Sequence, residues 1–145
     1  MRLRHHGAIK EKDAFLATGH ISPEESLILC REGRKRGVNM ILTHPEFPRT
    51  RIGRDDQAEL AKLGVVIEKN WFNLAQKSVM PEEMAETIRT VGSGHVYLAT
   101  DRGQEGAPTP VSELKRFIAV MLTCGIAEAQ IRDMVQKVPE EVVCR

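Results

Sequence analysis

Two short apolar runs, FLATGH at residues 15–20 and MILTHP at residues 40–45, each stop at a histidine. The residues between them carry the signals of a helix. Ser-Pro-Glu-Glu at 22–25 combines an N-cap, a first-turn proline and a capping box. Arg-Lys-Arg-Gly at 34–37 supplies the cations and the glycine that are typical of a helix C-terminus. The stretch therefore predicts a strand, a helix and a second strand.

The same alternation continues along the chain. Strands are predicted at 14–18, 39–43, 65–68 and 96–100, and further helices at 55–63, at 81–92, from Thr109-Pro110 onward and around 131–138. The segment 69–79 is ambiguous, a loop with a short helix. Because strands that alternate with helices pair in parallel through right-handed crossovers, we expect an α/β fold of four parallel βα units. Both an open doubly wound sheet and part of a (β/α)8 barrel fit this pattern.

Composition limits the possible partners and the compartment. The chain of 145 residues suits one domain, predicted at 13–145 after an N-terminal tail at 1–12. A net charge of +1 and an aromatic content of 4% argue against nucleic acid or an anionic membrane as partner. The three cysteines are far apart and form no CxxC pair, so we expect a reducing, cytoplasmic setting.

The predicted strands end in residues that can bind a metal or move a proton. His20, His44 and Glu68 lie 24 residues apart, and Asp101 follows the fourth strand. Because the carboxyl ends of parallel strands carry the chemistry of α/β folds, we expect these side chains at one rim. Imidazole and carboxylate suit a divalent metal, for which we expect zinc, with iron or manganese as alternatives. His20, His44 and Asp101 are the predicted ligands, and Asp101 is also the candidate for taking a proton from water.

Each of these residues also has an ordinary structural interpretation. A histidine after a strand is often a loop or capping residue. Aspartate before Arg-Gly, as at Asp101, is common in turns. Glu68 can be solvent-exposed or paired with Lys69. The prediction of a site depends on the coincidence of all four residues at strand ends.

Further residues are predicted to serve the same rim. Arg49, Arg51 and Arg102 follow predicted strands and are candidates for binding an anionic substrate, although a solvated loop explains them as well. Glu46 and Glu68 are candidates for holding a ligating imidazole in place through a hydrogen bond.

Five stretches resemble the second half of amidohydrolase-type metal-dependent hydrolases, closest to a poorly characterised, bacterial-type group of these barrels. They are LATGHISPEE, MILTHPEF, GVVIEKNWFN, SGHVYLATDRGQ and GAPTPVSELKRFI. The resemblance implies that His20, His44 and Asp101 correspond to the ligands on the fifth, sixth and eighth strands of such a barrel. The family's His-x-His pair on the first strand has no counterpart, because His5 and His6 are adjacent and follow no apolar strand.

The sequence thus predicts a half barrel with the activity of a metal-dependent hydrolase. Water activated by the metal would attack an amide, lactone or ester-type substrate. The alternative is a non-catalytic remnant that acts as an interaction module or binds a small anion. A half barrel exposes strand edges and one sheet face, so we expect a homo-oligomer or a second chain that supplies the missing half. A small open sheet with helices on both faces would avoid that requirement.

Overall fold

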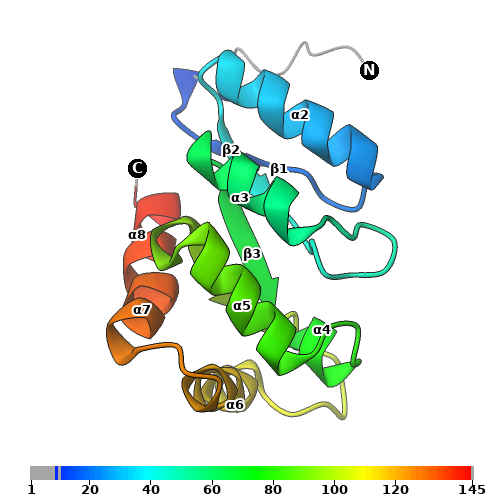
Figure 1. Cartoon of the computed structure of the whole chain (residues 1–145), viewed down its shortest axis with the longest axis vertical. Helices are drawn as coiled ribbons and strands as arrows, with labels where there is room; N and C mark the ends of the chain where they lie inside the picture. The colour runs from blue at the N-terminus through cyan, green and yellow to red at the C-terminus, as the bar shows by residue number, and fades with distance from the viewer. Residues whose placement is uncertain (1–8, 10, 145) are drawn as a thin grey trace.

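The computed structural model describes residue 9 and residues 11–144 (Figure 1). Most of the predicted tail, with His5 and His6, lies outside the described residues. The strands are β1 (Phe15–Ala17), β2 (Asn39–Leu42), β3 (Val66–Asn70) and β4 (Val96–Ala99). The α-helices are α2 (Pro23–Lys35), α3 (Arg54–Lys62), α4 (Trp71–Ala75), α5 (Pro81–Val91), α6 (Pro110–Thr123), α7 (Glu128–Arg132) and α8 (Val138–Val143). A 3-10 turn, η1 (Ser93–His95), precedes β4, and a π-helical turn, η2 (Asp133–Lys137), joins α7 to α8.

The described strands form one parallel sheet in the order β1-β2-β3-β4. The predicted α/β class with four parallel strands is therefore confirmed. Right-handed crossovers between strands in consecutive order place their helices on the same face of the sheet. Helices α2, α3 and α5 indeed form one layer, in which α3 contacts both neighbours (Figure 1). An open doubly wound sheet, with helices on both faces, does not match this arrangement.

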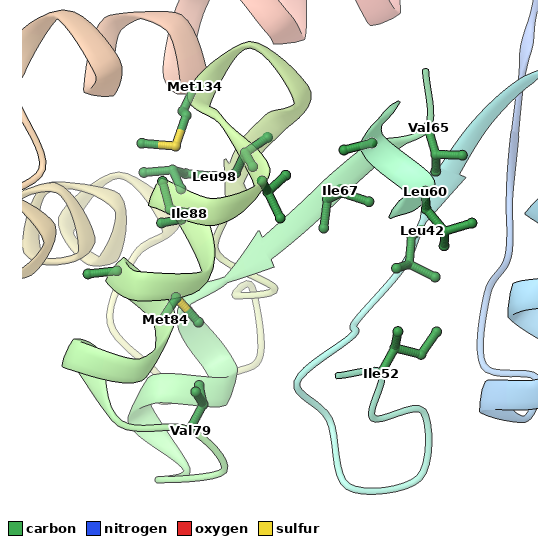
Figure 2. Close-up of a cluster of buried hydrophobic side chains, with 14 of the residues drawn as sticks. Leu42, Ile52, Leu60, Val65, Ile67, Val79, Met84, Ile88, Leu98 and Met134 are labelled. Atoms are coloured by element: carbon green, nitrogen blue, oxygen red, sulfur yellow. The ribbon is translucent and has the colours of Figure 1, made fainter. Parts of the chain in front are cut away.

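The hydrophobic core lies between the sheet and this helical layer. Met40, Leu42 and Ile67 point from the strands into it, and each is at most 1% exposed. Helix α5 contributes Ile88, and η2 contributes Met134, which closes the core beside β4 (Figure 2). Since side chains alternate along a strand, the intervening residues face the opposite side of the sheet. The carboxyl-terminal half of that opposite side carries the candidate site.

Helix α2 begins and ends as the sequence predicts. The Ser22 hydroxyl accepts a hydrogen bond from the Glu25 backbone N–H, and the Glu25 carboxylate accepts one from the Ser22 N–H. The chain leaves the helix through Gly37 in the left-handed region (φ 74°).

Three details of the predicted elements are wrong. Strand β3 continues for two residues after Glu68, so this residue does not end its strand. The apolar spacing of the predicted helices places Leu63 and Leu122 toward the core, but they are 46% and 39% exposed. On α6 the buried position is taken instead by Glu113, which accepts hydrogen bonds from Trp71, Arg102 and Arg116. These donors compensate for the burial of a charge that the apolar pattern did not predict.

Among the described residues, no helix has the length and apolar character needed to cross a membrane.

Candidate functional site

Three of the described strands are followed by the same sharp backbone turn. The second residue after β1, β2 and β4 has a positive φ: Gly19 (65°), His44 (50°) and Asp101 (52°). Only a few per cent of non-glycine residues adopt this conformation, and histidine and aspartate are among the more tolerant types. Its cost is of order 1–3 kcal/mol for a non-glycine residue. The chain thus turns sharply at each strand end, and two of the three predicted ligands occupy the turning position.

A pair of threonines joins the ends of β1 and β2. The Thr18 hydroxyl accepts a hydrogen bond from the Thr43 backbone N–H at 3.0 Å. The Thr43 hydroxyl accepts one from the Gly19 N–H at 3.4 Å. These reciprocal bonds fix the first turn against the second. The two histidines that follow are therefore held beside each other.

The rings of His20 and His44 form a stacked pair. Their centroids lie 4.9 Å apart and their planes differ by 15°. The Phe47 ring is tilted against His20, with centroids 6.4 Å apart. His20 is exposed, whereas the side chain of His44 is 15% exposed. The prediction that the ends of the first two strands bring their histidines together is borne out by this geometry.

A buried carboxylate lies behind His44. Glu68 Oε1 is 3.4 Å from His44 Nδ1 and accepts a hydrogen bond from the Asn70 amide at 2.8 Å. Its Oε2 accepts one from the Tyr97 hydroxyl at 3.1 Å. Burial and the charge of Glu68 raise the pKa of Tyr97 above its ordinary value, so the phenol stays protonated and donates. Glu68 is therefore an oriented acceptor beside His44, although it lies within its strand.

The Asn70 amide nitrogen also approaches His44 Nδ1, at 3.2 Å. A proton on Nδ1 can be shared with Glu68, and Nε2 is then the basic nitrogen of the ring. In the other tautomer, Nδ1 accepts from Asn70 and Nε2 carries the proton. The Asn70 oxygen accepts from the Phe72 N–H, so its amide nitrogen is fixed as a donor, and its contact with Nδ1 belongs to the second form, whereas the 3.4 Å contact with Glu68 belongs to the first. Two neighbours thus control which nitrogen of His44 is available to a ligand.

A pocket of about 350 Å³ opens in front of these residues. Its lining comes from the ends of β1, β2 and β4 and from the start of α4. The lining residues are His20, His44, Phe47, Arg49, Phe72, Asn73 and Asp101. All three predicted metal ligands therefore border one cavity, which we call the histidine pocket.

Asn73 is a site residue that sequence reasoning missed. It is 1% exposed, and neither its amide nitrogen nor its amide oxygen has a hydrogen-bond partner in the structure. A buried amide without partners is unusual and costs free energy. Asn70 caps α4 by accepting a hydrogen bond from the Phe72 N–H at 2.8 Å, and this turn brings Asn73 to the pocket. The Asn-Trp-Phe-Asn sequence at 70–73 was the available signal, as an N-cap followed by one helical turn.

The predicted arginines do not act together. Arg49 lines the histidine pocket. Arg102 pairs with Glu113 at 3.3 Å and lies over the Phe72 ring, 5.4 Å from its centroid. Phe72 lines the pocket, whereas Arg102 itself does not. Arg51 lies elsewhere, where it donates to the Ser78 carbonyl and pairs with Glu83 at 3.6 Å. A shared anion-binding role for all three does not match these positions.

Glu46 is also displaced from its predicted role. Its carboxylate bonds to the Lys69 ammonium and the Gln57 amide on the helical side of the sheet. It therefore supports neither histidine. The expected alternative pairing of Glu68 with Lys69 does not occur either, because successive residues of a strand point to opposite faces.

The histidine pair is the candidate for holding a metal ion. Within the part of the chain that the structure describes, however, no three His, Cys, Asp or Glu side chains are grouped so as to hold a metal ion. The described residues thus place His20 and His44 beside each other, and Asp101 lines the same pocket.

Comparison with known proteins finds a family that matches the amino-terminal part of the chain. Residues 7–68 are similar to a family of unknown function, DUF6282. The matched segment includes His20, His44 and Glu68 but ends before Asn73 and Asp101. Neither the curated proteins nor the solved structures provide a significant match.

Proposed function

We propose that the histidine pocket is the active site of a metal-dependent hydrolase of the amidohydrolase type. The observation that carries this proposal is the His20–His44 pair with the Glu68 carboxylate behind His44. Ligating histidines commonly give their second nitrogen to a carboxylate, which fixes the ring and raises its basicity. The substrate would be a small amide, lactone or ester. The consecutive strand order with helices on one face supports the view that the chain is half of a (β/α)8 barrel.

In this proposal each residue of the pocket has a separate task. His20 and His44 would hold a divalent cation such as zinc, which when bound supplies a Lewis acid that lowers the pKa of water. Glu68 keeps His44 oriented. Asp101, exposed at the pocket edge, accepts a proton from the attacking water. The Asn73 amide gives the substrate a hydrogen-bond donor and acceptor, and Arg49 favours a substrate with negative charge.

The first experiment is metal analysis by mass spectrometry of untagged protein purified without added metal. We expect about one zinc, iron or manganese ion per chain or per dimer, lost in the His20→Ala/His44→Ala variant. His95→Ala is the matched control, because His95 is an exposed histidine before the amino end of β4 and is not part of the pocket. Metal that stays in the double variant, or protein that binds none after dialysis against zinc and manganese, would contradict the proposal.

A metal-loaded protein should then hydrolyse members of an amide, lactone and ester panel. Asp101→Asn should lower kcat by a factor of about 10²–10⁴ if the carboxylate acts as a general base. The bound metal should remain, because the two histidines are intact. Loss of metal in Asp101→Asn would instead identify Asp101 as a ligand.

A second candidate function is the binding of a small anionic molecule without metal. The unpartnered Asn73 amide and the presence of Arg49 in the pocket favour it, as does the absence of a third grouped donor among the described residues. Binding of a carboxylate or phosphate ester that persists in metal-free protein, and that Asn73→Ala weakens, would support this function. Metal-dependent turnover would refute it as the main activity.

The opposite face of the sheet supports a proposal on assembly. Val66 and Tyr97 project away from the helical layer and are only partly buried. A barrel interior would be completed if four further parallel strands closed the sheet. We propose that a second copy of this chain or a separate chain supplies them.

A further inference from the structure

A second pocket of about 540 Å³ lies on the helical side of the sheet, between the loop after β2, the first turn of α3 and the first half of α5. It shares no lining residue with the histidine pocket. Its inner wall includes Glu46 and Gln57. Its outer wall is formed by Arg51, Arg54, Glu83 and Glu86, among others. We call it the Glu46 pocket.

The inner wall contains a buried ion pair with one unused oxygen. Lys69 is fully buried, and its ammonium bonds to Glu46 Oε1 and, at 2.6 Å, to Gln57 Oε1. Gln57 in turn donates to Glu46 Oε1 at 3.3 Å. Glu46 is 5% exposed, and its Oε2 has no partner in the structure. A buried carboxylate oxygen without a donor is costly, so this atom is the feature that points to a ligand.

The charge of the Glu46 pocket indicates which ligand. Five carboxylates and two guanidinium groups line it, which gives the lining a formal balance of −3, or −2 when the buried Lys69 ammonium on Glu46 is counted. Both guanidinium groups are already paired across the pocket, Arg51 with Glu83 at 3.6 Å and Arg54 with Glu86 at 2.6 Å. A free anion would therefore compete with carboxylates that are already in place. A cationic hydrogen-bond donor would offset the negative charge of the pocket and would donate to the unused oxygen of Glu46.

We propose that the Glu46 pocket binds a small organic molecule with a primary ammonium group, which donates a hydrogen bond to Glu46 Oε2. The buried Lys69 ammonium already makes this kind of contact with the other oxygen of the same carboxylate. Glu83 and Glu86 each pair with a guanidinium group through Oε1, and their second oxygens would accept a second positive charge near the mouth. A short aliphatic diamine meets both requirements. The site is independent of the histidine pocket and of its chemistry.

The test is calorimetric titration of the full chain at low ionic strength with 1,4-diaminobutane, with 1,4-butanediol as the neutral isostere. We expect saturable binding of the diamine and none of the diol. Glu46→Gln should weaken diamine binding at least tenfold, because the variant keeps an acceptor for Lys69 but loses the charge. Glu82→Gln is the matched control, since Glu82 is an exposed neighbour on α5 outside the pocket lining. The His20→Ala/His44→Ala variant should bind the diamine as the unchanged protein does.

The rim provides a second variant in case Glu46→Gln does not fold. Glu83→Gln/Glu86→Gln changes only exposed residues, and we expect it to weaken diamine binding severalfold because the formal balance falls to −1. Equal binding of diamine and diol would overturn the proposal. So would an equal loss in Glu82→Gln, which would show general attraction to an acidic surface, or unchanged binding in both the Glu46 and the rim variants.

Discussion

At the scale of single residues, the turning residues after β2 and β4 have a positive φ, which histidine and aspartate adopt more readily than most side chains. His44 and Asp101 occupy left-handed positions that glycine would fill without strain. These positions hold side chains that can bind a ligand or move a proton in place of glycine. Strained backbone of this kind clusters at functional sites. Gly19 takes the corresponding position after β1, and His20 follows it by one residue. The three turns thus present their side chains with different offsets from the strand end.

Cys30 gives a pH prediction at this scale. Burial raises the pKa of its thiol to about 12, from an ordinary value near 9. Between those values the unfolded chain loses a proton that the folded chain keeps, so the stability contributed by the neutral thiol falls as the pH rises above about 9. The urea midpoint should therefore decrease from pH 8 to pH 10.5. The Cys30→Val variant should show a smaller decrease, with the remainder due in part to Tyr97, whose pKa is also raised. An identical pH dependence in both proteins would contradict this explanation.

At the scale of elements, the packing of α2 against β2 depends on a glycine within the helix. Gly33 is buried, and a Cβ at this position would collide with the Met40 side chain, which is itself fully buried. The helix therefore lies closer to the strand than an alanine would allow. This contact sets the distance between the C-terminal part of α2 and β2.

Gly33→Ala should accordingly destabilise the protein, although alanine favours a helix over glycine by about 1 kcal/mol. Overpacking of a filled core costs about 1–3 kcal/mol, which exceeds this gain. Urea unfolding measures the change in free energy. In the Met40→Leu background, which removes the sulfur from the contact, the same substitution should cost less, as expected for residues that touch. A stabilising Gly33→Ala would show that the strand can move away.

At the scale of the whole molecule, the two faces of the sheet differ. The face toward α2, α3 and α5 is packed with apolar side chains, whereas the other face carries Glu68, Tyr97 and the histidine pocket at its carboxyl end. The same topology places the two pockets on opposite sides of the sheet.

We predict that the protein self-associates through the open face. Light scattering after size exclusion should give at least a dimer at about 100 μM, the range in which weak interfaces of moderate area are populated. Val66→Lys should shift the protein toward monomer, because it places a charge on that face. Ile28→Lys is the control, since Ile28 is 63% exposed on α2, away from the sheet. A monodisperse monomer for the unchanged protein would exclude self-association and leave a separate chain as the partner.

The sequence by itself determined the features that depend on near neighbours. The Ser22 cap, the glycine ends of the helices and the alternation of strand and helix are set within a few residues, and so is the presence of His20, His44 and Asp101 after strands. Parallel pairing then follows from that alternation, and it brings these residues to one rim. The half-barrel architecture and the hydrolase activity remain proposals.

Only the tertiary structure decided the features that depend on distant partners. Glu46 turns to Lys69, 23 residues away, and Trp71 reaches Glu113, 42 residues away. Glu68 lies inside β3 rather than at its end, yet the strand register brings it to Tyr97 and places it beneath His44. The face on which such a side chain lies changes with a shift of one residue in strand position, and local sequence signals do not determine strand boundaries that finely. The contacts of the buried charges and amides in both pockets therefore depend on how distant elements pack together.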